Sequence, residues 1–196
     1  MATSSSFLAD WLDAVVATPG LTALHDPAAA RAMLLDDALR AVDVVRAYEG
    51  TVADVGSGGG SPGIPLAAAL PEREFVLVEA ERRKCDFLRR WAPPNVRVVW
   101  GRAEEQEVDA YGVALAKALA QPATALEWVL PLVRAGGAAV LWLGPSADLG
   151  ALARVAEQLG GGDPIARAGL TVVQKLAPTP PGFPRRAGVA KKRPLA

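Results

Sequence analysis

A glycine-rich loop carries the clearest chemical signal in this chain. It follows the β-branched and apolar residues 51–55, has glycines at positions 56, 58 and 60, and precedes the apolar residues 64–70. This order predicts a buried strand, a loop nearly free of side chains, and a helix. Such a loop lets the backbone approach a ligand closely and adopt positive φ angles, and the start of the helix favours negative charge. The loop therefore predicts a ligand site; the alternative is a tight turn that binds nothing.

The spacing of the glycines separates several kinds of nucleotide site. Asp54 stands two residues before Gly56, so the pattern is D-x-G-x-G-x-G. A dinucleotide fingerprint, G-x-G-x-x-G, would need a glycine where the chain has Ser61, and the other match, over residues 58–63, begins two residues too late. A Walker loop would end in Gly-Lys-Ser or Gly-Lys-Thr, and this loop does not.

Glu79 is the second acidic landmark, because it ends the apolar run 75–79 that predicts the next strand. A carboxylate at that strand end can accept hydrogen bonds from both ribose hydroxyls of a nucleoside. The glycine pattern followed by a strand-end acid is typical of methyltransferases that use S-adenosylmethionine (SAM). We therefore expect SAM as the cofactor.

Length, charge and cysteine content set further bounds. At 196 residues the chain is expected to form one domain with a small extension. The formal net charge is +0, so a nucleic acid would have to meet a local basic patch. The single Cys85 excludes an internal disulfide and suggests a reducing compartment, where it is expected to pack in the core. With no signal peptide and no apolar run of about 18 residues, we expect a cytoplasmic protein with no membrane span. A monomer without a metal site is the default expectation.

From residue 51 the chain alternates strands and helices, which predicts an α/β fold. The expected strands are 51–55, 75–79, 96–100, 112–117 and 138–143, with 165–167 and 170–175 as a closing antiparallel pair. The expected helices are 63–70, 82–91, 122–134 and 147–159, with Gly136 and Gly137 capping the third. Residues 5–17 and 27–47 should form N-terminal helices, with Asp26 as an N-cap and a break near Asp36 and Asp37.

This order fits the Rossmann-like sheet of class I SAM-dependent methyltransferases, mostly parallel with an antiparallel last strand. We divide the chain into a helical extension packed on the core (1–48), a SAM-binding domain (49–177) and a basic, proline-rich tail (178–196).

Two further segments could contact ligands. After the third strand, the backbone N–H of Ala103 and the carboxylate of Glu104 could bind the edge of an adenine; the alternative is a helix cap with solvated acids. The tail has five prolines and no acid after residue 176, and its cations could meet RNA phosphates: Arg185, Arg186, Lys191, Lys192 and Arg193. The alternative for the tail is a disordered, solubilising segment.

Several stretches together resemble the RsmG (GidB) family of small-subunit ribosomal RNA methyltransferases. They are LTA (21–23), DVGSGGGSPGIPL (54–66), VEAERRKCDFL (78–88), RAEE (102–105), TPPGFPRRAG (179–188) and PL (194–195). The proline-containing continuation of the glycine loop is unusual among methyltransferases. The resemblance extends over nearly the whole chain.

The resemblance implies methyl transfer from SAM to N7 of a guanine in 16S rRNA, within the 30S subunit. The cofactor contacts that it implies are Asp54, Gly56, Ser57, Gly58, Gly60, Ser61, Glu79, Ala80, Ala103, Glu104 and Lys117. No catalytic side chain is implied, because N7 of guanine is a lone pair with no proton to remove; alignment of the reactants suffices. Lys117 is a candidate contact for either substrate or cofactor.

The chain departs from the family pattern at three places on the presumed RNA side. Lys117 stands where the family usually has arginine, Leu143 where it has lysine, and residues 168–170 where an Arg-His pair precedes the last strand. These departures leave two alternatives open. One is a divergent paralogue that methylates another RNA or a small molecule, and the other is a non-catalytic protein that binds RNA or the ribosome.

Overall fold

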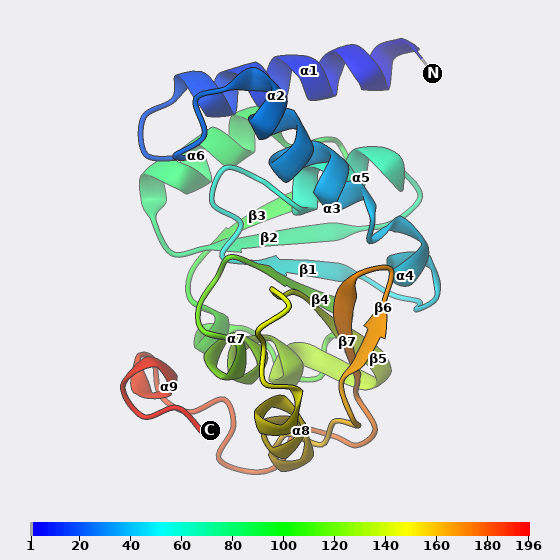
Figure 1. Ribbon diagram of the computed structural model, residues 1–196, viewed down its shortest axis with the longest axis vertical. Coiled ribbons are helices and arrows are strands. Elements are labelled where there is room, and N and C mark those ends of the chain that lie inside the picture. Colours follow the sequence, from blue (N-terminus) through cyan, green and yellow to red (C-terminus); the bar gives the residue numbers. More distant parts are fainter. Residues whose placement is uncertain (1) are drawn as a thin grey trace.

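A seven-stranded sheet forms the centre of the molecule, as a computed structural model that describes residues 2–196 shows (Figure 1). The strand order is β3-β2-β1-β4-β5-β7-β6. The strands are β1 (Val52–Val55), β2 (Phe75–Glu79), β3 (Val96–Trp100), β4 (Tyr111–Lys117), β5 (Val133–Trp142), β6 (Ile165–Arg167) and β7 (Leu170–Gln174). Strands β1 to β5 pair in parallel, and β7 runs antiparallel to both β5 and β6. The predicted mostly parallel sheet with an antiparallel end is confirmed.

The central strands are apolar on both faces because helices cover both faces. Alternate residues of β1, such as Val52 and Ala53, belong to different core clusters on opposite sides of the sheet. One face packs on α7 (Pro122–Val129) and α8 (Leu149–Gln158). The other packs on α4 (Val42–Arg46), α5 (Gly63–Ala69) and α6 (Arg82–Trp91). Figure 1 shows the two helical layers above and below the strands.

The sheet reverses its order between β1 and β4, and this reversal positions the site. From β1 the chain proceeds outward to β2 and β3, then returns to β4 on the other side of β1. The connections on the two sides of such a point diverge and leave a crevice outside the carboxyl ends of the strands. The glycine loop, Glu79 and Lys117 all stand at those ends.

The N-terminal segment folds as a series of helices over one face of the sheet. It comprises α1 (Ala2–Ala17), α2 (Pro27–Ala30), the π-helix η1 (Arg31–Asp36) and α3 (Asp37–Leu39), followed by α4. Asp26 caps α2 as expected, since its carboxylate accepts a 2.7 Å hydrogen bond from the N–H of Ala29. The expected break near Asp36 and Asp37 coincides with the change from π-helical to α-helical hydrogen bonding.

The expected helix 122–134 is too long, and the structure shows why. Helix α7 ends at Val129, a 3-10 turn η3 (Leu130–Leu132) follows, and β5 already begins at Val133. Gly136 and Gly137 therefore lie inside β5 and do not cap a helix. A Cβ on Gly137 would lie 2.3 Å from the carbonyl oxygen of Gly112 in β4, where the register of the two strands shifts. The glycines permit this close approach of two backbones.

The tail is packed against the domain. Thr179 Oγ1 contacts Asp109 Oδ1 at 2.8 Å, and Phe183 and Leu195 pack on the core cluster under α7 and α8. The chain ends in a short helix, α9 (Val189–Lys192), which lies beside α7 in Figure 1. The structure therefore contradicts the alternative of a disordered tail, whereas contact of its cations with RNA stays a prediction.

Candidate active site

A cavity of about 610 Å³ opens at the carboxyl ends of β1, β2 and β4. Its size lies within the range of about 300–1,000 Å³ that is typical of small-molecule sites. Four local segments that the sequence singled out meet there: the glycine loop, the end of β2, the turn after β3 and the end of β4. The predicted cofactor residues that line the cavity are Gly56, Ser57, Gly58, Ser61, Glu79, Ala80, Ala103, Glu104 and Lys117.

The glycine loop has the backbone conformation that its spacing predicts. Gly56, Gly58 and Gly60 have φ angles of +71°, +55° and +104°, whereas Gly59, outside the alternation, is not in this region. Side chains disfavour these angles, so glycine at every second position follows from the course of the chain.

Most N–H groups of the loop are already hydrogen-bonded within the protein. Those of Gly56 and Ser57 donate to the carbonyl oxygen of Val78, at 2.8 and 3.3 Å, and that of Gly60 donates to Ser57 at 2.7 Å. The N–H of Gly58 donates to Glu79 Oε2 at 2.9 Å. A phosphate site needs such donors to be free and pointing at the anion. The loop is therefore better suited to close contact with a neutral or cationic ligand than to binding phosphate.

Glu79 stands at the end of β2, on the floor of the cavity. Its side chain is buried, and its two oxygens accept hydrogen bonds from the N–H groups of Gly58 and Glu81, at 2.9 and 2.8 Å. A carboxylate oxygen has two lone pairs, so each oxygen keeps capacity for one more donor. The position agrees with the expected acceptor for two ribose hydroxyls. The buried Cys85 lies next to Glu79, with its Sγ 3.2 Å from the backbone oxygen of Glu79.

Asp54 and Gly60 lie behind the cavity wall. Asp54 is 1% exposed, and its Oδ2 accepts a hydrogen bond from the N–H of Gly63 at 3.1 Å, while Oδ1 has no partner. Burial raises the pKa of this carboxyl to about 7, partly opposed by the neighbouring Ser57 hydroxyl and by the hydrogen bond from Gly63. The Ser57 hydroxyl donates to the backbone carbonyl oxygen of Asp54, at 2.8 Å. The carboxyl thus takes up the first N–H of α5, the group that the sequence had suggested for a ligand. Gly60 has a φ of +104°, and a Cβ there would lie 2.5 Å from Ile64 Cδ1, so both its backbone conformation and its packing favour glycine.

Glu104 and Lys117 face the cavity while bound to other parts of the protein. Glu104 Oε1 accepts a 3.0 Å hydrogen bond from the N–H of Gly188 in the tail. Lys117 Nζ forms an ion pair with Asp37 Oδ2 at 2.8 Å and donates to the carbonyl oxygen of Met33. Lys117 therefore connects the end of β4 to the N-terminal helices.

The family model described as GidB, rRNA small subunit methyltransferase G, matches residues 6–153. This chain belongs to that family. Curated relatives named ribosomal RNA small subunit methyltransferase G support the assignment. That of a Synechococcus strain (JA-2-3B'a(2-13)) is 35% identical over 91% of this chain and 79% of its own length. That of Moorella thermoacetica is 36% identical over 74% of this chain and 69% of its own length. The family resemblance stated from the sequence is confirmed.

Solved structures confirm the class I SAM-dependent methyltransferase fold. A TehB-like SAM-dependent methyltransferase from Corynebacterium glutamicum superposes with a TM-score of 0.58 at 19% identity, covering 89% of this chain and 98% of that one. The T. thermophilus 16S rRNA N2 G1207 methyltransferase, solved with AdoMet and guanosine, superposes with a TM-score of 0.57 at 18% identity, covering 75% of this chain and 40% of that one.

Sequence reasoning missed the part of this family member's cavity that comes from the N-terminal helices, from the turn between α1 and α2, and from α7. These lining residues are Trp11, Val15, Leu21, Thr22, Leu34 and Trp128. Trp11 Nε1 donates to the carbonyl oxygen of Gly59 at 3.0 Å, so α1 is tied to the glycine loop. Trp128 Nε1 is buried without a hydrogen-bond partner, which makes it a candidate donor to a ligand. In the sequence, an apolar residue at helical spacing indicates only a buried face.

The predicted RNA-binding cations lie in different surroundings. Lys191, on α9, lines the cavity. Arg185 forms a two-bond ion pair with the buried Glu127, with both N···O distances 2.5 Å. Arg186, Lys192 and Arg193 are exposed. Their contact with RNA stays a prediction, and Arg185 has a protein partner besides.

Within residues 2–196, no group of three or more His, Cys, Asp or Glu side chains is arranged to hold a metal ion. None of the helices in that range is long and apolar enough to cross a membrane.

Proposed function

We propose that this protein transfers a methyl group from SAM to N7 of a guanine in 16S rRNA. The observation that carries the proposal is the cavity where the glycine loop, Glu79 and the turn with Ala103 and Glu104 meet. Relatives of the same family carry the name ribosomal RNA small subunit methyltransferase G, which supports the RNA substrate.

The residues of the cavity fit SAM. The Glu79 oxygens have spare capacity for two ribose hydroxyls. Ala103 and Glu104 stand beside them, where an adenine edge would lie. Most N–H groups of the loop are already bonded within the protein, which suits a ligand that bears a positive sulfur more than one that bears phosphates. Asp54 and Gly60 support the loop from behind.

The proposed reaction needs no catalytic side chain. Bound SAM supplies a sulfonium-activated methyl group. Guanine N7 is already nucleophilic and carries no proton, so no general base is needed. The protein has to hold the base in line with the methyl group and exclude competing positions, which is catalysis by proximity and orientation. A base within folded RNA would have to be unpaired or flipped to reach the cavity.

The molecule has no net charge, so binding of RNA would have to depend on a local cluster of cations. Arg186, Lys192 and Arg193 are exposed on the tail beside the cavity, and Lys191 lines it. We propose that the protein acts as a monomer in the cytoplasm, where 30S subunits are found. The proposed reaction requires no metal.

A second candidate is methylation of another RNA or of a small molecule. The departures at Lys117, Leu143 and residues 168–170 favour it, because they lie on the presumed RNA side. A protein that binds the ribosome without turnover is a third possibility, which would bind RNA equally with and without SAM.

Transfer of tritiated methyl from SAM to 30S subunits tests the proposal. The subunits should come from cells that lack the modification, and mass spectrometry should locate the label. We expect one labelled guanine per subunit, methylated at N7. Label on another atom, or on a small molecule only, would favour the second candidate, and RNA binding without any transfer would favour the third.

A further inference from the structure

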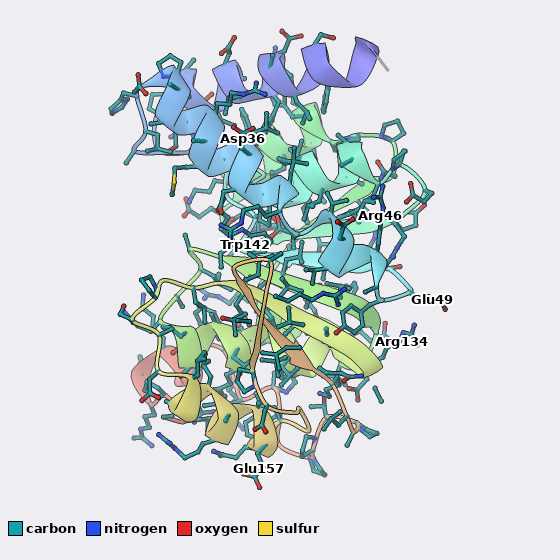
Figure 2. The ribbon with its side chains drawn as sticks, turned by 45° about the vertical axis from the view of Figure 1, so that its right-hand side comes forward. Asp36, Arg46, Glu49, Arg134, Trp142 and Glu157 are labelled. Atoms are coloured by element: carbon teal, nitrogen blue, oxygen red, sulfur yellow. The ribbon has the colours of Figure 1, made fainter. Side chains whose placement is uncertain are left out.

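A second, smaller cavity adjoins the first. It has a volume of about 250 Å³, and Lys117 and Ala118 line both cavities. Its remaining walls come from the N-terminal helices, the end of β5 and the turn between β6 and β7. Figure 2 shows Trp142 between the N-terminal helices and the β6–β7 hairpin. Nothing in the proposed binding of SAM uses this space.

One side of the second cavity is formed by the indole of Trp142, and Lys117 Nζ lies over part of that ring, 5.9 Å from its centroid. The Trp142 ring is partly exposed, and its Nε1 donates to the carbonyl oxygen of Asp37 at 3.1 Å, which fixes the orientation of the indole. Met33, 52% exposed, adds an apolar side chain to the same cavity. Proteins that bind unpaired bases commonly stack them on aromatic side chains.

The other side carries a carboxylate held between two cations. Asp37 Oδ2 lies 2.8 Å from Lys117 Nζ, and Asp37 Oδ1 lies 2.6 Å from Arg40 Nη1. Arg40 in turn donates to the carbonyl oxygen of Ala168, with distances of 2.9 and 3.2 Å, and fills the space beside Gly169. These contacts hold Asp37 in place at the wall of the cavity.

We propose that the second cavity holds the target guanine and that Asp37 reads its Watson–Crick edge. The inference rests on the proposed function, which requires N7 to face the first cavity. Around the guanine edge, O6 follows N7, and N1–H and the N2 amino group follow O6. The side chains run in a matching order. Lys117, shared by both cavities, could donate to O6 in place of its long 3.5 Å contact with Ser61 Oγ, and the neighbouring Asp37 could accept from N1–H and N2–H.

The same order excludes adenine. Adenine presents an amino group where guanine has O6, so a donor would face the donor Lys117. Its N1 carries no proton, so an acceptor would face the acceptor Asp37. Specificity would thus come from two unfavourable contacts as well as from two favourable ones. Stacking on Trp142 would be shared by both bases.

The three departures from the family pattern also lie together in the structure. Lys117, Leu143 and Gly169 all line the second cavity. The guanidinium of Arg40 occupies the space where a side chain at position 169 would begin, 1.8 Å from the position of its Cβ. The cation missing from the hairpin is therefore replaced in space by one from the N-terminal helices.

Nucleotide binding tests the assignment independently of methyl transfer. Saturating S-adenosylhomocysteine would fill the first cavity, and equilibrium dialysis would measure the binding of GMP, IMP and AMP. IMP lacks only the N2 amino group, so it should bind about tenfold more weakly than GMP, and AMP more weakly still. Asp37→Asn should remove the difference between GMP and IMP, and Trp142→Ala should weaken all three nucleotides.

Asp36→Asn is the matched control. Asp36 precedes Asp37 and is half-exposed. Its Oδ1 forms a long ion pair with Arg31 Nε, at 3.7 Å. It lines neither cavity, so the control should keep the wild-type preference for GMP. No GMP binding, no preference between GMP and IMP, or a preference that survives Asp37→Asn would overturn the assignment.

Methyl transfer to 30S subunits separates the two proposals. Loss of GMP discrimination in Asp37→Asn should be accompanied by a drop of about tenfold or more in kcat/KM. If the wild-type protein methylates guanine N7 but Asp37→Asn does so equally well, the base site is wrong and the function stands. If the wild-type protein discriminates GMP but leaves 30S subunits unlabelled, the base site stands and the substrate is wrong.

Discussion

Asp54 is a buried carboxyl group of which one oxygen has no hydrogen-bond partner. The other oxygen accepts the N–H of Gly63 and so fixes the end of the glycine loop to the start of α5. Removing a carboxylate from water without a full set of partners favours the neutral form. Burial accordingly raises its pKa from 3.8 to about 7. The residue that begins the glycine pattern thus acts on the shape of the loop, not on the ligand surface.

The raised pKa predicts a pH-dependent stability. The folded state binds a proton at Asp54 that the unfolded state has already lost, so the free energy of unfolding falls as pH rises from about 4 to about 7. Between about pH 5 and pH 8 the loss attributable to this group is about 2–3 kcal/mol. Asp54→Asn should remove it, as urea denaturation at several pH values would show. Equal pH slopes for the two proteins would contradict the assignment of this pKa.

At the scale of the elements, polar contacts fix the tail against α7, and we call these contacts the clamp. Arg185 pairs with Glu127, which is 2% exposed, and its Nη2 also donates to the carbonyl oxygen of Arg193 at 2.8 Å. Glu104 holds Gly188 from the other side. These contacts place α9 and Lys191 at the edge of the first cavity.

Arg185→Ala should destabilise the protein by about 3–5 kcal/mol, because it leaves the carboxylate of Glu127 buried and unpaired. Replacing both partners with methionine should recover most of that loss, since no charge is then left without a partner. Urea denaturation of the single and double variants measures the coupling. Arg186→Ala, at an exposed position, is the control and should change stability by less than about 0.5 kcal/mol. A double variant as unstable as Arg185→Ala would argue against the clamp.

The elements themselves were largely predictable from local patterns, with informative exceptions. The bounds of β2, α6 and β3 agree with expectation, because both strands are short apolar runs and Pro93 and Pro94 separate α6 from β3. The end of α7 was not predictable. Val133 is apolar in either a helix or a strand, and its pairing with Tyr111 in β4 decides between them. That pairing depends on residues more than twenty positions away in the sequence, which no local pattern describes.

At the scale of the whole molecule, the site likewise has one part that local motifs predict and another that depends on contacts between residues far apart in the sequence. The glycine loop, Glu79 and the Ala103–Glu105 turn belong to short motifs at strand ends, so the sequence indicated that wall of the cavity. Another part of the wall includes Trp11, whose hydrogen bond to Gly59 joins residues 48 positions apart. Only the folded chain brings α1, the tail and the second cavity to the carboxyl edge of the sheet.

The absence of net charge makes RNA binding depend on a few exposed cations. Replacing Arg186, Lys192 and Arg193 together with alanine should lower the slope of log affinity against log salt concentration by about 2, for single-stranded contacts. SAM affinity should be unchanged, because none of the three lines a cavity. Filter binding to 16S rRNA over a range of salt concentrations measures the slope. An unchanged slope would place the RNA on another surface.

The first cavity should bind SAM with its ribose on Glu79. Isothermal titration calorimetry with SAM tests it most directly, with Glu79→Gln as the variant and Glu72→Gln, at an exposed position, as the control. We predict one SAM per chain for the wild-type and control proteins, and binding weaker by about tenfold or more for Glu79→Gln. No binding by the wild-type protein, or equal affinity in all three, would contradict it.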